Sequence, residues 1–204
     1  MQANPDQPTD SGHRVYPKHR VYYYAALALV SLSVDLASKE LAFSKLGLYQ
    51  HSEWILDSWL RFRIQTSLNE GALWGMGQGF APVFAMLSVI AVAGIIYWLF
   101  FKGAARSAWL TTALGLVTGG TLGNLYDRLA LHGVAFPNRT EPAQAVRDFL
   151  HFIIGSFDWP IFNLADSFLV IGAMMMMAQS FRQSAESTEE VSDSSAAASA
   201  VTQK

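Results

Sequence analysis

Apolar side chains gather in four long segments along the chain. The segments cover residues 21–43, 80–101, 108–126 and 161–181, and each is close to the roughly 20 mostly apolar residues that a helix needs to cross a bilayer. The second segment contains no charged residue, whereas the third is rich in glycine and threonine. The pattern predicts an all-α membrane protein with four transmembrane helices.

The first segment also fits a cleavable signal peptide, because basic residues precede its apolar core. Asp35 and Lys39 lie toward its far end. Charged side chains fit poorly at a cleavage site, which requires small residues. We therefore favour a membrane helix over residues 21–43.

Two longer connections, residues 44–79 and 129–160, join the first to the second segment and the third to the fourth. Residues 60–64 alternate apolar and polar side chains, which is typical of a half-buried strand. Several glycines then interrupt the pattern. We expect a small extracytoplasmic β-element between the first two helices.

Both ends of the chain lack the apolar pattern. Residues 183–204 are rich in Ser, Ala and Glu, a composition that buries too little apolar surface to offset the entropy lost on ordering. We expect a flexible segment over residues 1–20, one membrane domain over residues 21–181, and a disordered tail over residues 182–204.

The composition supports a membrane location and excludes several kinds of chemistry. Only 15% of the residues are charged, against roughly 25% in soluble domains. The net charge of −2 shows no nucleic-acid footprint. The chain has no cysteine and no pair of histidines at metal-ligand spacing, so disulfides, thiol nucleophiles and zinc motifs are excluded. We expect no metal and no cofactor.

Basic residues in the short flanks predict the orientation, because they are enriched on the cytoplasmic side. They precede the first segment, lie between the second and third, and follow the fourth; they are Arg14, Lys18, Arg20, Lys102, Arg106 and Arg182. With four crossings, these flanks share one side of the membrane. Both termini are then cytoplasmic, and the two long connections lie outside.

Some polar residues occupy positions where lipid makes them costly. Asp166 lies in the apolar stretch FNLADSFLV, three residues after Asn163, and a carboxylate there requires a partner. Asp35 and Lys39 are four residues apart with the acid first, which is the favourable order for a helical ion pair. That pair either completes the end of the first helix or supports a site.

The third segment carries small and polar residues on defined faces. Gly115, Gly119 and Gly123 recur at every fourth position and allow another helix to approach closely. Asn124 and the pair Asp127–Arg128 form a polar cluster near the outer end of this segment.

Two carboxylates brought together suggest a chemical use. When like charges are close, the pKa of one acid rises while the other acid stays ionised. The ionised carboxylate takes a proton from water, and the protonated one donates to a carbonyl oxygen or a leaving amine. Such a pair hydrolyses peptides without a metal or a covalent nucleophile. Spacing alone leaves either Asp127 or Asp148 as the partner of Asp166.

Five motifs together resemble the lipoprotein signal peptidase family, also called signal peptidase II. They are DLASK (residues 35–39), NEGALWG (69–75), GGTLGNLYDR (119–128), VRDF (146–149) and FNLAD (162–166). Each motif is weak alone. Their order, and their placement relative to the four apolar segments, match the family.

The resemblance implies a bacterial enzyme of the inner membrane that cleaves prolipoprotein signal peptides before a diacylglyceryl-modified cysteine. It implies that Asp148 and Asp166 are the catalytic aspartates and that the site lies near the outer face. Residues implied to contact the substrate are Asn69, Gly71, Asn124, Arg128 and Asn163. Residues implied to support the site are Asp35, Lys39 and Asp127. Membrane lipids and the cyclic peptide globomycin are implied partners.

One segment departs from the family pattern. Residues 129–147 form a longer connection than expected between two of the motifs. A mobile lid over the site is one interpretation. A passive loop that tolerates extra length is the other, and we favour it slightly.

Two other classes of protein fit some of the same residues. A proton-coupled transporter also carries acids within its spans, but the polar residues here gather at one outer end and show no inverted repeat. A membrane scaffold needs polar residues only to assemble its helices. Hydrolysis of a lipid-modified peptide separates both classes from a peptidase.

Overall fold

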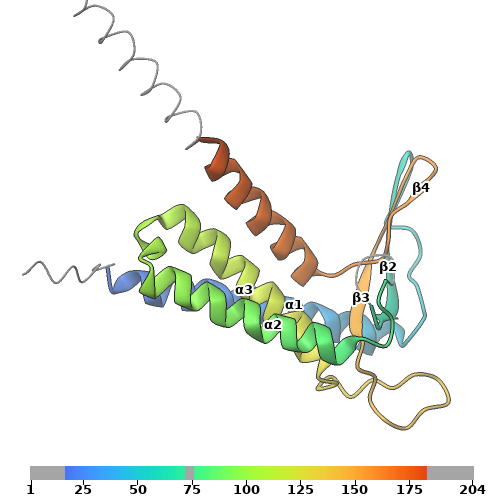
Figure 1. The fold of residues 1–204 in the computed structure, drawn as a ribbon. Coiled ribbons are helices and arrows are strands. Elements are labelled where there is room, and N and C mark those ends of the chain that lie inside the picture. Colours follow the sequence, from blue (N-terminus) through green and yellow to red (C-terminus); the bar gives the residue numbers. More distant parts are fainter. Residues whose placement is uncertain (1–16, 72–75, 183–204) are drawn as a thin grey trace, which may run out of the picture.

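The computed structural model describes residues 17–71 and 76–182. It shows a bundle of helices with a small β-sheet at one end (Figure 1). The long helices of the described residues are α1 (His19–Leu46), α2 (Ala81–Ile96), α3 (Ala108–Arg128) and a C-terminal helix (Leu164–Arg182). A π-helical segment, Tyr97–Phe101, extends α2, and a short 3₁₀ helix, Ala104–Arg106, precedes α3.

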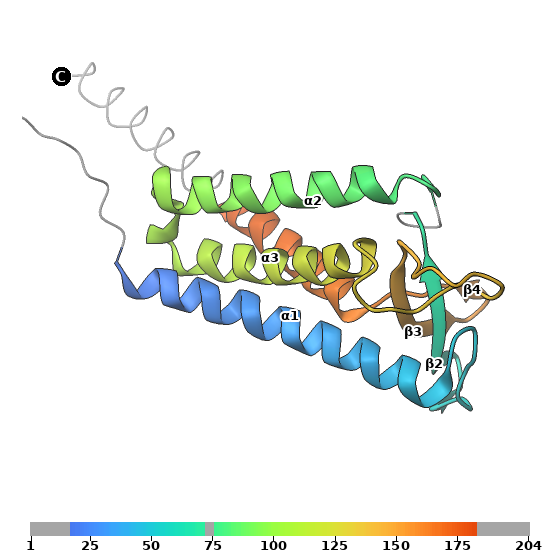
Figure 2. The same cartoon turned by 90° about the horizontal axis from the view of Figure 1, so that it is seen from below.

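Three of these helices are long and apolar enough to cross a membrane, namely His19–Leu46, Ala81–Phe101 and Leu164–Arg182. The helix α3 lies between α1 and α2 (Figure 2), and it buries threonines and glycines rather than large apolar side chains. A helix surrounded by other helices needs small contact residues more than apolar ones. A four-helix architecture is therefore present, and α3 as a fourth crossing stays a prediction.

Glycines on α3 permit its close packing. A Cβ atom on Gly119 would lie 2.5 Å from the Ser31 side chain and 2.7 Å from the Ala28 carbonyl oxygen of α1. On a neighbouring face of α3, a Cβ atom on Gly120 would lie 2.5 Å from the Ala165 carbonyl oxygen of the C-terminal helix. The predicted glycine stripe is confirmed as a helix contact, because larger residues would separate these backbones.

The β-sheet includes more of the chain than the predicted β-element between the first two helices. Its antiparallel strands follow the order β1 (Leu56–Asp57), β2 (Leu60–Asn69), β3 (Val146–Ile154) and β4 (Phe157–Asp158). We expected a β-element only between the first two helices, but the second connection supplies half of the strands. The prediction missed β3 because its partner β2 lies about eighty residues earlier in the chain, and such non-local pairing leaves no local pattern.

The sheet lies at the end of the bundle where α1 ends and the C-terminal helix begins (Figures 1 and 2). The start of α1, the connection from α2 to α3 and the end of the C-terminal helix lie at the opposite end. Helix α1 begins at His19, so the last two residues of the predicted flexible segment are helical. Most of that segment, and nearly all of the predicted tail, lie outside the described residues.

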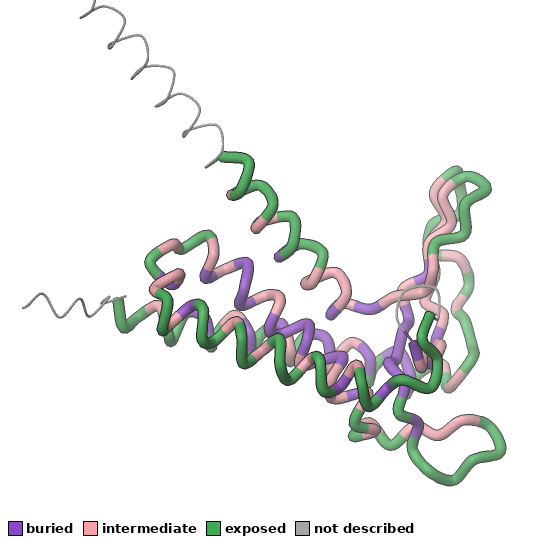
Figure 3. Tube along the Cα trace, viewed as in Figure 1, coloured by how far each residue is buried: buried purple, intermediate pink, exposed green. Residues whose placement is uncertain are grey.

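The helices of the bundle differ in how far they are buried. Buried residues concentrate on α3 and on the strands beside it, whereas α2 and the C-terminal helix are mostly exposed (Figure 3). Many of the exposed side chains on these two helices are large and apolar; they include Val83, Leu87, Val89, Ile90, Val170, Ile171 and Met174. Such an apolar outer surface is expected where lipid, rather than water, is the solvent.

The glycine contact predicts opposite effects of one substitution at two sites. We expect Gly119→Ala to lower the free energy of unfolding by about 1–3 kcal/mol, because its methyl group overpacks the α1–α3 contact. In α2, a Cβ atom on Gly94 would have no atom of the described residues within 4 Å. Gly94→Ala is therefore the control, and we expect it to stabilise the helix by about 0.5–1 kcal/mol. Thermal unfolding in detergent measures both changes, and equal effects would contradict the packing.

Candidate active site

The site forms where the C-terminal helix begins beside β3. The Leu150 N–H donates to the Phe162 carbonyl oxygen at 2.8 Å, and the Phe162 N–H donates to the Leu150 carbonyl oxygen at 3.1 Å. This pairing holds the residues before the C-terminal helix against the strand. It places Asn163 and Asp166 next to Asp148, although the two aspartates are 18 residues apart in sequence.

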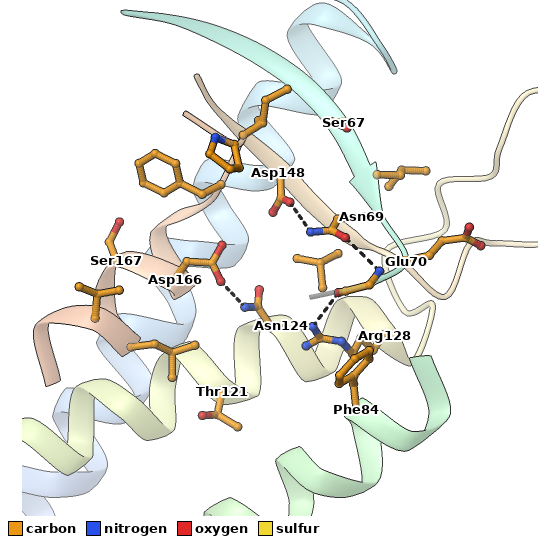
Figure 4. Close-up of a pocket in the computed structure, with 18 of the residues that line it drawn as sticks. Ser67, Asn69, Glu70, Phe84, Thr121, Asn124, Arg128, Asp148, Asp166 and Ser167 are labelled. Carbon is orange, nitrogen blue, oxygen red and sulfur yellow. Dashed lines mark hydrogen bonds between the residues drawn. The ribbon is translucent and has the colours of Figure 1, made fainter. Parts of the chain in front are cut away.

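Asparagine side chains connect the two carboxylates. The Asn163 amide donates to Asp148 Oδ1 at 2.6 Å, and the Asn163 backbone N–H donates to Asp166 Oδ2 at 3.2 Å. The Asn69 amide donates to the other oxygen of Asp148 at 3.2 Å. The Asn124 amide donates to Asp166 Oδ1 at 2.8 Å. Figure 4 shows Asp148 and Asp166 side by side, with Asn69 and Asn124 next to them.

The environment of Asp148 favours its protonated form. Burial, and then the nearby Asp166 carboxylate, raise the pKa of Asp148 to about 8, while the hydrogen bond from Asn163 opposes the rise. Only 3% of Asp148 is exposed. At neutral pH Asp148 therefore carries a proton beside Asp166. A protonated carboxyl group beside a second carboxyl group is an arrangement suited to acid–base chemistry.

A buried cluster of ion pairs between α1 and α3 lies next to the two carboxylates. Lys39 Nζ lies 2.7 Å from Asp35 Oδ2 and 3.1 Å from Asp127 Oδ2, and all three side chains are fully buried. Lys39 also donates to Asn124 Oδ1 at 3.0 Å. Because Asn124 donates in turn to Asp166, Lys39 orients a side chain that contacts a carboxylate. Asp35 further accepts the Ala165 N–H at 2.9 Å, which positions the first turn of the C-terminal helix.

Arg147 is part of this cluster, and sequence reasoning gave it no role. Its guanidinium donates to Asp127 at 3.1 Å and contacts Glu40 at 3.2 Å, and its backbone N–H donates to Asp127 at 3.0 Å. Arg147 is 2% exposed. A basic residue directly before Asp148 in an apolar strand is a local signal for such a role, but its partners lie on α3 and α1.

The remaining predicted residues line the same region. Arg128 donates to the Gly71 carbonyl oxygen at 3.4 Å, and its guanidinium lies 5.2 Å from the centre of the Phe84 ring. The Gly71 N–H donates to Asn69 Oδ1 at 3.0 Å. Arg128 Nε is buried and has no hydrogen-bond partner among the described residues. Residues 72–75 of the predicted NEGALWG motif lie outside the described residues.

A cavity of roughly 1320 Å³ opens onto these groups. Its polar lining includes Asn69, Gly71, Asn124, Arg128, Asp148 and Asp166, which are all the predicted catalytic and substrate-contacting residues except Asn163. Asp35, Lys39 and Asp127 do not line it; Lys39 contacts the cavity residue Asn124, and Asp127 contacts Arg147. Apolar residues of α2 and the C-terminal helix line the rest. Within residues 17–71 and 76–182, no group of three or more His, Asp or Glu side chains has metal-binding geometry.

Fold and site together define a membrane protein with two neighbouring carboxylates, the buried Asp148 and the partly buried Asp166, beside a small β-sheet. The family described as Signal peptidase (SPase) II matches residues 27–182. A lipoprotein signal peptidase of Rhodopirellula baltica is 44% identical and covers 85% of this chain and 78% of its own length. One from Bacillus subtilis is 33% identical, with coverage of 82% and 98%.

Solved structures show the same fold. A bacterial membrane enzyme determined by the in meso method at 2.3 Å resolution superposes with a TM-score of 0.68 at 24% identity, covering 81% of this chain and 92% of that one. A second such enzyme, at 1.9 Å resolution, gives a TM-score of 0.65 at 25% identity. With the family match over most of the chain, these findings show that this chain belongs to the signal peptidase II family of proteases.

The ion cluster predicts a large effect of removing one charge. We expect Lys39→Met to lower the free energy of unfolding by about 3–5 kcal/mol, because Asp35 and Asp127 would lose their shared buried cation. Lys45→Met is the control on the same helix, since Lys45 is exposed, and we expect a change within about 0.5 kcal/mol. Unfolding in detergent, monitored by circular dichroism, compares the two variants. Similar stability of both would show that the cluster is not needed for folding.

Proposed function

We propose that this protein removes the signal peptide from prolipoproteins that carry a diacylglyceryl-modified cysteine, by cutting the peptide bond just before that cysteine. Family membership supports a lipoprotein-processing protease. The observation that carries the proposal is the pair of carboxylates, Asp148 and Asp166, connected by Asn163 in one cavity. We also propose that globomycin-type inhibitors bind in this cavity.

The two carboxylates divide the chemistry between them. Asp166 accepts hydrogen bonds from the Asn124 amide and the Asn163 backbone N–H, and it takes a proton from a water molecule as the water oxygen attacks the scissile carbonyl carbon. Asp148 donates its proton to the carbonyl oxygen, which balances the charge that develops there. As the C–N bond then breaks, a proton passes from the dyad to the leaving amine. No metal and no covalent intermediate are required.

Other residues of the site bind and orient the substrate in this proposal. Asn69 and Asn124 hold the carboxylates by their side-chain amides, while Arg128 and Gly71 present polar groups to the peptide backbone from the same cavity. Phe84 and the apolar wall of α2 face the lipid-modified part of the substrate. The cavity thus combines polar and apolar surfaces, as a peptide with attached acyl chains requires.

We further propose a topology with α3 as the fourth crossing. The sheet and the site then lie near the outer face of the bacterial inner membrane, and both termini lie in the cytoplasm. Support comes from the placement of Lys102, Arg106 and Arg182 at the end of the bundle opposite to the sheet, because such residues favour the cytoplasmic side.

Substitution of either aspartate tests the dyad. We expect Asp148→Asn or Asp166→Asn to lower kcat on a diacylglyceryl-modified lipobox peptide by roughly 10²–10⁴-fold, because each variant removes an acid or a base from the reaction. The control is Asp57→Asn, which alters an exposed carboxylate in β1, and we expect it to keep normal turnover. Near-normal cleavage by either dyad variant would refute the assignment.

The pKa of Asp148 sets a pH dependence with a definite sign. Because this pKa is raised to about 8, the proton that Asp148 must donate is present below pH 8 and is lost as the pH rises through that value. We expect kcat/KM to fall above about pH 8, approaching tenfold per pH unit. A peptide substrate with no group titrating between pH 6 and 10 isolates the enzyme's contribution. Constant kcat/KM up to pH 9.5, in protein that stays folded by circular dichroism, would exclude Asp148 as the acid.

A further inference from the structure

Part of the cavity wall consists of residues that were not predicted to belong to the site. Tyr49, which follows α1, Glu70, at the end of β2, and Phe136, in the long connection before β3, all line it. In Figure 4, Glu70 lies beyond Asn69 as seen from Asp166. None of these three residues belongs to a membrane-spanning helix.

Phe136 is held in place by the segment that departs from the family pattern. Residues Ala135 and Pro142 pair as an antiparallel bridge, and the Ala143 N–H donates to the Val134 carbonyl oxygen at 2.8 Å. Val134 and Phe136 pack against the core that contains Phe149. The connection is therefore folded against the core beside the sheet.

His132 forms hydrogen bonds to both ends of this connection. Its Nδ1 accepts the Val134 N–H at 2.9 Å, so Nε2 carries the proton and donates to the Ala145 carbonyl oxygen at 3.2 Å. Burial lowers the pKa of His132, which favours this neutral form at pH 7. These hydrogen bonds join the two ends of the connection and thereby define the position of Phe136 in the cavity wall.

Glu70 gives this wall its chemical character. In the described parts of the chain, no cationic group lies within 4 Å of its carboxylate. Burial and the charge of Glu70 together raise the pKa of Tyr49, which places the phenol within electrostatic range of the carboxylate. The Arg139 guanidinium lies 5.5 Å from the centre of the Phe136 ring, but it is exposed, so solvent screens its charge. Glu70 lines the same cavity as the rings of Tyr49 and Phe136, and a carboxylate together with aromatic faces suits a cationic side chain.

The arrangement of the cavity indicates which part of a substrate meets this wall. On the other side of the carboxylates, Ser167, Val170 and Ile171 of the C-terminal helix line the cavity deeper in the bundle. An apolar signal segment that enters from the membrane occupies that side. The chain that continues beyond the scissile bond then leaves toward the end of the cavity that carries the sheet, which Glu70 and Phe136 line together with Phe152 and Ile154 of β3.

We propose that Tyr49, Glu70 and Phe136 form a subsite for the residues that directly follow the lipid-modified cysteine, and that Glu70 selects a basic side chain there over an acidic one. This inference rests on the proposed function. It assigns a role to the connection of residues 129–145 that the dyad does not require.

Charge-matched substrates test the subsite. Three diacylglyceryl-modified peptides are compared, with lysine, glutamine or glutamate two residues after the cysteine and otherwise identical sequences. For the native protein we expect kcat/KM to be about five-fold higher with lysine than with glutamate, the range of a partly exposed ion pair. In Glu70→Gln we expect this ratio to approach one. For the native protein, we expect high salt to bring the lysine-to-glutamate ratio of kcat/KM closer to one as well.

Phe136→Ala tests the aromatic wall with a second ratio. The second ratio is kcat/KM for the glutamine peptide divided by kcat/KM for a shorter peptide that ends as an amide at the cysteine. In Phe136→Ala we expect this ratio to be smaller than in the native protein, because the ring no longer contacts the residues after the cysteine. Leu131→Ala is the control within the same connection, since Leu131 is 58% exposed and does not line the cavity, and we expect both ratios to match those of the native protein.

Different results would contradict the proposed function and the proposed subsite. If the native protein does not cleave the glutamine peptide, the proposed function itself is wrong. If it cleaves that peptide but Glu70→Gln keeps the native lysine-to-glutamate ratio, the charge selection is wrong. If Phe136→Ala keeps the native advantage of the longer peptide, the wall does not bind the residues after the cysteine.

Discussion

The ammonium group of Lys39, buried among Asp35, Asp127 and Asn124, is the interaction on which the site depends. A charge in such a place is tolerable only when its partners are complete, so the cluster requires α1 and α3 to stay in a single relative position. Through Asn124 the cluster reaches Asp166, and through Asp127 and Arg147 it reaches the strand that carries Asp148. One set of ion pairs thereby positions two carboxylates that come from different elements.

Close helix packing makes this cluster possible. Gly123 lies so near the Asp35 carboxylate that any side chain there would displace it, and Gly119 brings the backbones of α1 and α3 together. The strand geometry then separates the charges. Because successive residues of a strand point to opposite faces, Arg147 turns toward Asp127 while Asp148 turns into the cavity. Asp148 therefore follows Arg147 in the sequence but forms no ion pair with it.

Much of the site was predictable because its residues break a local pattern. Asp35, Lys39, Asn163 and Asp166 are polar in apolar segments, and lipid makes such residues costly enough to require a role. Asp148 gave no comparable signal, since a carboxylate in a connection between helices is ordinary. The motif resemblance, rather than spacing, selected it over Asp127. Arg147 was overlooked for the same reason, because its significance depends on partners that are distant in the chain.

The amino-acid sequence by itself determined the four helices, the glycine contact and the polar positions at one end of the bundle, because helix periodicity and apolar length are local properties. Only the tertiary structure decided that the second connection pairs with the first as a sheet, that Asp127 bonds to Arg147 while Asp148 faces Asp166, and that Phe136 lines the cavity. These outcomes depend on contacts between residues tens of positions apart. The free energy of such contacts is set by burial and partner geometry, which no short stretch of residues encodes.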